Sequence, residues 1–231
     1  MKLLYPSADK IVANSSDTAS DIKKYIRRDI ENLITINNPI FNNRIYDLSN
    51  ERSNLDDFYQ LQKPIIISVG RFFPQKNFSF LIKSFVKVKK EFNNASLVIL
   101  GDGPLKNQLF SLAKELKVEK DVHFLGFVDN PYKYLKNSDV FVLSSLYEGF
   151  GNVIVEALAV GTPVVATHCP GGPHEILQNG KFGILVPVNN EDAMANAIIQ
   201  TLLNKKDSSW LIERAKDFSI CEIANKYLKH L

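Results

Sequence analysis

Six short runs of apolar, mostly β-branched residues recur from residue 65 onward, and this alternation constrains the fold more than any other feature. Each run is long enough for a buried strand, and segments with helical periodicity lie between them. The expected strands cover residues 65–69, 97–100, 122–125, 140–143, 164–167 and 184–188. Continuously apolar strands joined through helices are typical of a parallel sheet that is covered on both faces. The sequence therefore predicts an α/β domain with a Rossmann-like, doubly wound parallel sheet.

The first 63 residues are organised differently from the rest of the chain. Residues 10–15 and 33–40 resemble short strands, and a helix that Asp17 is placed to cap runs between them through Asp29. Two strands and one helix cannot enclose a core alone, so we expect a remnant of an N-terminal Rossmann-like domain. The predicted organisation is this remnant over residues 1–40, a polar linker over 41–63, a main domain over 64–216 and a C-terminal helix over 217–231.

Composition excludes several other classes of protein. The 45% of hydrophobic residues supports a real core, and a net charge of +3 does not predict a nucleic-acid partner. Cys169 and Cys221 lack the spacing of a metal site or a redox pair, which favours free thiols in a reducing compartment. No apolar run approaches the roughly 20 residues that cross a bilayer. We expect a cytoplasmic protein, either soluble or bound peripherally at the inner face of the membrane.

The residues that follow the expected strands are rich in polar groups and glycine. Ligands of open parallel sheets gather outside the carboxyl ends of the strands, which makes these loops the candidates for a site. They are GRFFPQK at 70–76, GDGP at 101–104, SSLYEGFGN at 144–152 and HCPGGPHE at 168–175. In the first loop, the guanidinium of Arg71 and the ammonium of Lys76 suit a diphosphate. The alternative for both residues is ordinary surface charge beside a turn.

The stretch EGFGNVIVEALAV, at residues 148–160, combines an expected helix start with two carboxylates. Its glycines let the backbone approach a ligand closely, and Asn152 begins a helix whose free N–H groups attract an anion. Glu156 interrupts an apolar run, where an unpaired charge is expensive to bury. Glu148 and Glu156 can address opposite ends of one elongated ligand. The alternatives are a buried ion pair for Glu156 and a helix-dipole partner for Glu148.

The loop PGGPHE also combines two glycines, an expected helix start and a carboxylate. Glu175 stands beside an expected helix start, where a carboxylate also simply favours the helix dipole. His168 and His174 are expected at the same ligand edge, whereas His123 is expected to pack within a strand and His230 to lie at the surface. No histidine shows a metal-ligand spacing, so the sequence predicts no metal site.

Taken in order, these motifs resemble the retaining GT-B glycosyltransferases of family four, also called glycosyl transferases group one. The matching features are GRFFPQKN, GDGPL, HFLGFV, the E-x7-E pair within EGFGNVIVEALAVGTPVVAT, and GGPHEIL followed by NGKFGILVPVNN. The resemblance spans residue 64 to about residue 216. It departs from the family at Asn77, where glycine is frequent, and at the N-terminus, where roughly 100 to 150 residues of the first domain have no counterpart.

The resemblance implies a role for each residue of the site. Arg71 and Lys76 would hold the donor diphosphate, Glu148 would lie beside the donor sugar, and these three are the expected catalytic residues. Glu156 would accept hydrogen bonds from the ribose hydroxyls. The donor site as a whole would consist of Gly70, Arg71, Lys76, Phe127 and Val128 at the nucleobase, Glu148, Gly149, Phe150, Gly151, Asn152, Val153 and Glu156.

The implied activity is retaining transfer of a hexosyl or N-acetylhexosaminyl group from a nucleotide-diphosphate sugar to a glycan or lipid-linked acceptor. A UDP-sugar is favoured, and bacterial lipopolysaccharide or related polysaccharide synthesis is the expected setting. The departing nucleotide would serve as the base, and neither a cofactor nor a metal is expected. One alternative is a non-catalytic sugar-nucleotide-binding module, and another is an enzyme completed by a partner that supplies the missing domain. A dehydrogenase is disfavoured because GDGPLK lacks GxGxxG.

Overall fold

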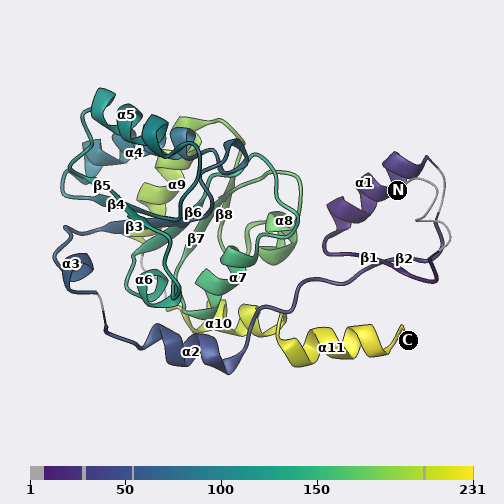
Figure 1. The fold of residues 1–231 in the computed structure, drawn as a ribbon. Coiled ribbons are helices and arrows are strands. Elements are labelled where there is room, and N and C mark those ends of the chain that lie inside the picture. The colour runs from purple at the N-terminus through teal and green to yellow at the C-terminus, as the bar shows by residue number, and fades with distance from the viewer. Residues whose placement is uncertain (1–7, 28–29, 54, 205–206, 231) are drawn as a thin grey trace.

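The computed structural model describes residues 8–27, 30–53, 55–204 and 207–230. Its centre is a sheet of six parallel strands (Figure 1). The strands are β3 (Ile65–Val69), β4 (Ser96–Leu100), β5 (Val122–Gly126), β6 (Val140–Leu143), β7 (Val164–Thr167) and β8 (Ile184–Val186). Their order is β5-β4-β3-β6-β7-β8, which confirms the predicted doubly wound sheet. The strand order reverses between β3 and β6, and the carboxyl ends of these two strands border the crevice where such sheets bind ligands.

Helices cover both faces of this sheet, because successive strand residues point to opposite sides. Ile65 and Ile67 enter one core cluster, whereas Ile66 enters the other. The cluster that contains Ile66 packs under α4 (Phe78–Glu91), α5 (Lys106–Glu115) and α9 (Glu191–Leu203). The cluster that contains Ile65 packs under α6 (Tyr132–Lys136), α7 (Asn152–Ala159) and α10 (Ser209–Lys216). Short turns complete the domain: η2 (Pro74–Lys76), α8 (Pro173–Ile176) and η3 (Gln178–Gly180).

The segment over residues 41–63 corrects the prediction of a polar linker. It contains α2 (Asn43–Ser49) and α3 (Asp56–Tyr59), and its apolar side chains belong to the core of the large domain. Ile45, Leu55 and Phe58 are all buried there. Few apolar residues mark this segment in the sequence, but three of them enter the core and Phe41 and Leu61 pack partly against it, so the segment is a packed layer of the domain.

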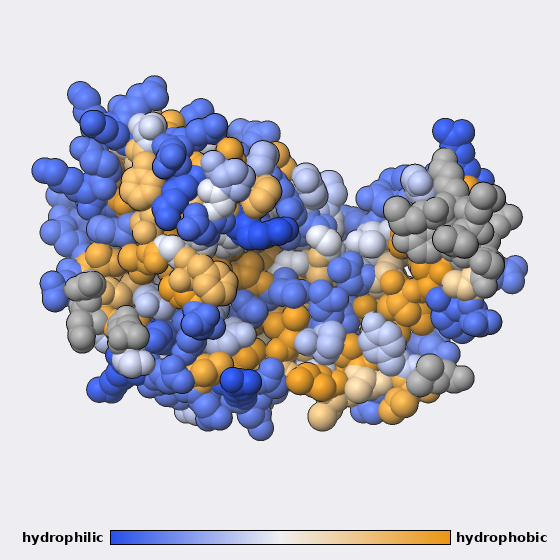
Figure 2. Space-filling model, in the orientation of Figure 1, coloured by the Kyte–Doolittle hydropathy of each residue, from blue (hydrophilic) through white to orange (hydrophobic). Residues whose placement is uncertain are grey.

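A separate parallel pair, β1 (Ile11–Ala13) and β2 (Leu33–Thr35), lies to one side, and α1 (Ser16–Ile26) connects its two strands along the chain (Figure 1). We call residues 8–40, as far as they are described, the small unit. Ser15, and not Asp17 as predicted, caps α1: its side chain accepts a hydrogen bond from the backbone N–H of Thr18 at 3.1 Å. Figure 2 shows a notch in the molecular surface between the small unit and the large domain.

The chain passes from the small unit to the large domain beside its own C-terminal segment. The N–H of Ile40 donates to the carbonyl of Phe218 at 2.9 Å, and the N–H of Ile220 donates to the carbonyl of Phe41 at 3.2 Å. Ser219 then caps the last helix, α11 (Ile220–Leu228), close to the predicted start. Among the described residues, no helix combines the length and apolar composition needed to cross a membrane.

Candidate functional site

The loops after β3 and β6 lie against each other at the carboxyl edge of the sheet. The hydroxyl of Ser144 donates to the carbonyl of Lys76 at 2.7 Å. The N–H of Leu146 donates to the carbonyl of Gln75 at 2.8 Å, and the side-chain amide of Gln75 donates to the carbonyl of Tyr147 at 2.8 Å. Hydrogen bonds in both directions fix the two loops together. The sequence-predicted residues on these loops therefore share one site.

Lys76 and Glu148 form an ion pair in the middle of this contact. The Nζ atom of Lys76 lies 2.6 Å from Oε1 of Glu148, and the hydroxyl of Ser145 donates to the same oxygen at 2.6 Å. The two charged side chains are only 17% and 8% exposed, respectively. Glu148 is thus a partner of Lys76. A lysine ammonium has three donor hydrogens, so Lys76 keeps donors for a second anion.

Gly70 makes room for the stem of Lys76. A Cβ atom at residue 70 would lie 3.1 Å from Cε of Lys76 and 3.2 Å from its Cδ. Asn77, which ends the same turn, has φ of 51° and ψ of 42°, the left-handed conformation that glycine adopts readily. The departure from the family at residue 77 therefore leaves the turn intact, because asparagine tolerates this conformation better than most residues.

Arg71 is exposed, and its guanidinium carbon lies 5.2 Å from the centre of the Phe73 ring. Stacking on an aromatic ring orients a guanidinium without using its N–H donors. Within the described part of the chain, Arg71 forms no ion pair. Its full set of donors is therefore available to an anion at the edge of the site.

The loop after β7 supports the Glu148 loop from behind. The N–H of Glu148 donates to the carbonyl of Pro170 at 2.9 Å. Gly171 has φ of 118°, and a Cβ atom there would lie 2.0 Å from the carbonyl oxygen of Glu148. A Cβ atom at Gly172 would lie 2.3 Å from the carbonyl oxygen of Phe150. Only glycine fits at either position, so the PGG motif serves backbone packing.

The start of α7 presents unpaired backbone donors. Gly151, with φ of 96°, precedes the helix, and the N–H groups of Asn152 and Val153 have no acceptor among the described residues. Such groups and the helix dipole attract anions. Phe150 contributes differently from its backbone: its ring is buried and packs edge-on against Phe218, with centroids 5.5 Å apart. The ring anchors the loop in the core.

Glu156 lies one turn inside α7 and has no ion pair or hydrogen bond within the described residues. Burial raises the pKa of its carboxyl group to about 7. This decides against the alternative of a buried ion pair for the part of the chain that the structure describes. A mostly buried carboxyl group without a protein partner is an acceptor that a ligand can use.

The loop after β5 leads toward Glu156. Phe127 is 78% exposed, whereas Val128 packs partly against the core. The loop ends at α6, whose first residue, Tyr132, lies close enough to Glu156 for the carboxylate to help raise the pKa of its phenol, after the larger effect of burial. Sequence reasoning missed Tyr132 because a single tyrosine beside a proline carries no site signal. It also missed Ser145, whose role depends on the loop geometry.

The histidines and cysteines lie in the surroundings that the sequence predicts for them. The rings of His168 and His174 lie 5.9 Å apart at the carboxyl edge of the sheet, as expected. His123 is half-buried in β5, and this burial lowers the pKa of its imidazole. Both cysteines are free. The described residues contain no group of three or more histidine, cysteine, aspartate or glutamate side chains that could hold a metal ion.

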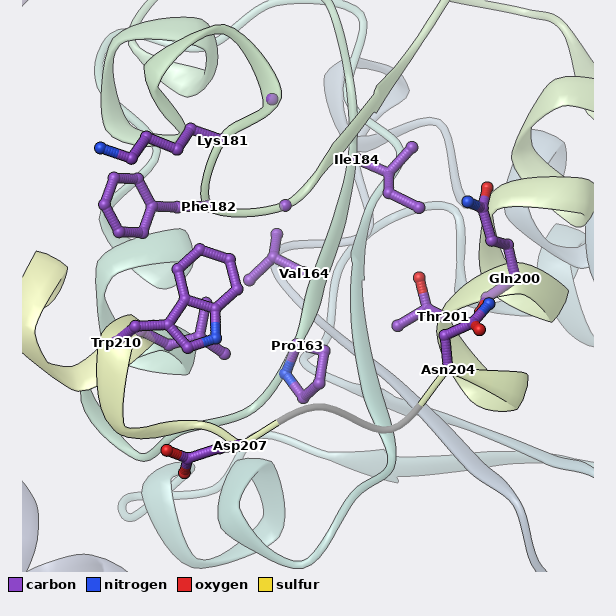
Figure 3. A pocket seen from close by; sticks show the side chains of 13 residues that line it. Pro163, Val164, Lys181, Phe182, Ile184, Gln200, Thr201, Asn204, Asp207 and Trp210 are labelled. Atoms are coloured by element: carbon purple, nitrogen blue, oxygen red, sulfur yellow. The ribbon is translucent and has the colours of Figure 1, made fainter.

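A cavity of about 180 Å³ lies at the opposite edge of the sheet, beside the first residues of β7 and β8 (Figure 3). Val164 and Ile184 line it, and the stacked rings of Phe182 and Trp210, with centroids 5.1 Å apart, close one side. None of the predicted site residues contributes to its wall. The cavity and the candidate site are therefore separate.

Comparison with known proteins connects this arrangement to a family. Residues 53–218 match the family model for "Glycosyl transferases group 1". The chain is 36% identical over 235 residues to the N-acetylgalactosamine-N,N'-diacetylbacillosaminyl-diphospho-undecaprenol 4-alpha-N-acetylgalactosaminyltransferase of Campylobacter jejuni. That match covers 100% of this chain and 62% of the relative. The N-acetyl-alpha-D-glucosaminyl L-malate synthase of Bacillus anthracis is 30% identical, with 92% of this chain and 58% of the relative covered.

Solved structures show the same fold. A mutant of S. aureus TarM, crystallised with Fondaparinux, alpha-GlcNAc-glycerol and UDP, superimposes with a TM-score of 0.81 at 26% identity. The match covers 97% of this chain and 44% of TarM. Anabaena HepE, crystallised with UDP and glucose, gives a TM-score of 0.82 at 24% identity over 96% of this chain and 62% of HepE. The chain thus spans less than two thirds of the proteins that it resembles.

Proposed function

Because the chain belongs to the glycosyl transferases group 1 family, we propose that its carboxyl-edge loops bind a nucleotide-diphosphate sugar for retaining glycosyl transfer. The observation that supports this proposal is that three kinds of anion donor lie on two loops that are hydrogen-bonded to each other. These are the exposed guanidinium of Arg71, the ammonium of Lys76 and the open N–H groups at the start of α7. Each donor suits a phosphate oxygen, and together they span a group larger than a single phosphate.

The diphosphate is proposed to occupy the region between Lys76 and the start of α7. During transfer, the bond between the anomeric carbon of the sugar and the diphosphate oxygen breaks, and negative charge builds on the diphosphate. Fixed donors that face this charge stabilise the transition state more than the ground state. The acceptor hydroxyl forms the new bond on the face that the diphosphate leaves, and its proton passes to the departing phosphate oxygen. Glu148 holds Lys76 in place beside the sugar.

The nucleoside is proposed to lie on the other side of α7. Glu156 accepts hydrogen bonds from the ribose hydroxyls, and Phe127 and Val128 border the base. The carboxyl group of Glu156, which has no partner among the described residues, and the 78% exposed ring of Phe127 support this placement. A UDP-sugar is favoured because the TarM structure contains UDP. Neither a metal nor a cofactor takes part in the proposed reaction, so EDTA should leave UDP affinity unchanged.

The acceptor is proposed to be a glycan or a lipid-linked sugar. The C. jejuni relative is named for transfer to a diphospho-undecaprenol acceptor, and TarM was crystallised with alpha-GlcNAc-glycerol. The chain covers 62% of the first of these proteins and 44% of the second. The alternative is a sugar-nucleotide-binding module without turnover of its own. Release of UDP from a UDP-sugar and a lipid-linked acceptor supports the enzyme, whereas tight binding without release supports the module.

Calorimetric titration tests the diphosphate assignment directly. Arg71→Ala should weaken UDP about 10- to 150-fold, since a charged hydrogen bond contributes about 1.5 to 3 kcal/mol. Uridine has no diphosphate, so its affinity should change less than twofold. Arg52→Ala, which removes an exposed arginine from another loop, is the matched control and should leave both affinities unchanged. If Arg71→Ala weakens UDP and uridine equally, Arg71 does not bind the diphosphate.

A second titration tests the ribose assignment. Glu156→Ala should weaken both UDP and uridine, by about 1 to 3 kcal/mol, because both ligands carry the ribose hydroxyls. Glu156→Ala should therefore lower the affinity for both ligands, whereas Arg71→Ala should lower the affinity for UDP alone. Unchanged affinity for both ligands would exclude Glu156 from the nucleoside site.

A further inference from the structure

The small unit contacts the large domain through hydrogen bonds to the loops of the candidate site. The N–H of Gly171 donates to Oδ2 of Asp17 at 2.8 Å. Ser16 donates to Oε1 of Glu175 through both its backbone N–H and its hydroxyl. The side-chain amide of Asn37 donates to the other Glu175 oxygen at 3.3 Å. Each unit thus supplies a carboxylate that binds backbone donors of the other.

Further contacts reach the Glu148–Asn152 segment itself. The side-chain amide of Asn38 donates to Oδ1 of Asn152 at 2.8 Å. The hydroxyl of Thr18 lies 3.5 Å from the carbonyl of Gly149, at the limit of a hydrogen bond. The amide of Asn14 covers Gly149, where a Cβ atom would lie 3.3 Å from Nδ2. We call all of these contacts, together with those of Asp17 and Glu175, the polar interface.

The polar interface differs from the core contacts in its energetics. Helix α1 has no buried residue, so it gains little from apolar burial. Hydrogen bonds to charged carboxylates are stronger than those between neutral groups, and losing one partner leaves the other without a bond. The position of α1 therefore depends strongly on Asp17 and Glu175.

The geometry links Asp17 to the anion-binding segment through Gly171. Asp17 holds the N–H of Gly171, and the Cα of Gly171 packs directly against the backbone of Glu148. The N–H of Glu148 is bonded to the neighbouring Pro170. A shift of Gly171 must therefore move Glu148 and the backbone donors that follow it. Packed backbone contacts of this kind have little room to adapt.

We propose that Asp17 and Glu175 are positioning residues that hold the Glu148–Asn152 segment in its anion-binding shape. Docking of the small unit and binding of the diphosphate are then coupled, and the coupling acts equally in both directions. The ligand in this statement rests on the proposed function. The effect of Asp17 and Glu175 on the shape of the loop is independent of the proposed function, because it concerns the protein without a ligand.

The backbone around Glu175 is held independently of its carboxylate, which makes a clean test possible. Arg214 donates from one terminal nitrogen to the carbonyl of Glu175 at 2.7 Å and from Nε to the carbonyl of Ile176 at 2.8 Å. Glu175→Ala removes the contact with α1 and leaves α8 attached to α10. Asp17 lies in the first turn of α1 and belongs to neither core cluster, so Asp17→Ala also leaves the core of the large domain intact.

Hydrogen exchange and calorimetry on the full chain test the proposal in two arms. In the free protein, Asp17→Ala and Glu175→Ala should each raise the exchange rate of amides in 148–152 and in the first turn of α1 at least fivefold. In titrations, both variants should weaken UDP three- to tenfold. Asp17→Asn and Glu175→Gln keep an acceptor oxygen and should restore most of the affinity. Glu119→Ala, at an exposed site elsewhere, should match the wild type in both arms.

The outcomes separate this proposal from the proposed function. If the wild type binds UDP and both alanine variants bind it equally well, the positioning role is overturned. Unchanged exchange of residues 148–152 in both variants also overturns it, whatever the ligand. Failure of the wild type to bind UDP refutes the proposed function, and the exchange arm still decides whether the carboxylates hold the loop. If the alanine variants only destabilise the fold, their unfolding temperature should fall and Asp17→Asn and Glu175→Gln should not recover the affinity for UDP. That result would also overturn the positioning role.

Discussion

The large domain and the small unit are held in place by different interactions. Two apolar clusters, one on each face of the six-stranded sheet, stabilise the large domain. The small unit pairs only two short strands and places an exposed helix against the site loops through the polar interface. Apolar burial is insensitive to small shifts in direction, whereas hydrogen bonds require correct geometry. The large domain can therefore fold around its own core, while the small unit takes its position from the loops that are proposed to bind the donor.

Truncating one core side chain in each region tests most clearly whether the large domain and the small unit are stabilised separately. Phe141 in β6 is 0% exposed, and Phe141→Ala should lower the free energy of unfolding by about 3 to 5 kcal/mol. Trp210 is the only tryptophan, so its fluorescence during urea denaturation follows the large domain. The midpoint of this transition should fall strongly.

Ile36 in the small unit is nearly as buried, at 2% exposed, and provides the matched variant. Ile36→Ala should leave the Trp210 transition unchanged and should increase hydrogen exchange only in β1, α1 and β2. If the Trp210 midpoint instead falls as far as it does for Phe141→Ala, the two regions unfold as one unit and the comparison is wrong.

The next largest effect comes from Glu156, whose burial lowers the free energy of unfolding of the large domain when its carboxyl group is ionised. The folded pKa of about 7 exceeds the ordinary value of 4.5, so the folded chain keeps a proton that the unfolded chain has lost between these pH values. Stability of the wild type should therefore fall as pH rises through this window. Glu156→Gln removes the effect and should be more stable than the wild type by about 1 to 3 kcal/mol at pH 8.

The same variant should show no gain at pH 4, where both states of the wild type are protonated. Thermal unfolding at the two pH values measures the difference. A gain of equal size at both would show that packing, and not the charge of Glu156, is responsible.

A double-mutant cycle on Lys76 and Glu148 should give a smaller effect. The pair is neither fully buried nor fully exposed, so a coupling energy of about 2 kcal/mol is expected, between the values for surface and buried pairs. Urea denaturation of Lys76→Met, Glu148→Gln and the double variant provides the measurement. Additive losses, with no coupling, would mean that the ion pair does not fix the two loops.

Removing the cap of α1 should have the smallest effect. Ser15→Ala loses the hydrogen bond from the N–H of Thr18 and should cost about 1 kcal/mol, confined to the small unit. Hydrogen exchange in α1 should increase, and the Trp210 transition should stay in place. Ser20→Ala, farther along the same helix at an exposed position, is the matched control and should leave exchange in α1 unchanged.

The sequence predicts the sheet well because its evidence is local. The apolar runs that form β3, β6 and β7 end at glycine or polar residues, and the predicted bounds agree with those observed. Asn77 shows the same principle, since its left-handed backbone explains why glycine is common there. The family resemblance added the choice of site residues, which the structure brings to one edge of the sheet but whose roles stay predictions.

The polar interface could not be predicted, because its contacts join residues far apart in the sequence. Asp17 and Gly171 are separated by 154 positions, and neither carries a local signal for the other. The prediction that Asp17 caps α1 failed for a related reason: Ser15 is equally suited to capping, and only the long-range contact shows why Asp17 points away. The sequence predicts a linker over residues 41–63 because the few apolar residues there are far apart in the sequence, and only the folded core brings them together.

Hydrogen exchange of the full chain with and without UDP tests most directly whether the carboxyl-edge loops bind the nucleotide. If they do, UDP should slow exchange in residues 70–77, 127–132 and 148–156, the segments that contain Lys76, Phe127 and Glu156. Protection confined to residues 180–184 and 200–211, around the separate cavity beside Trp210, would contradict this assignment.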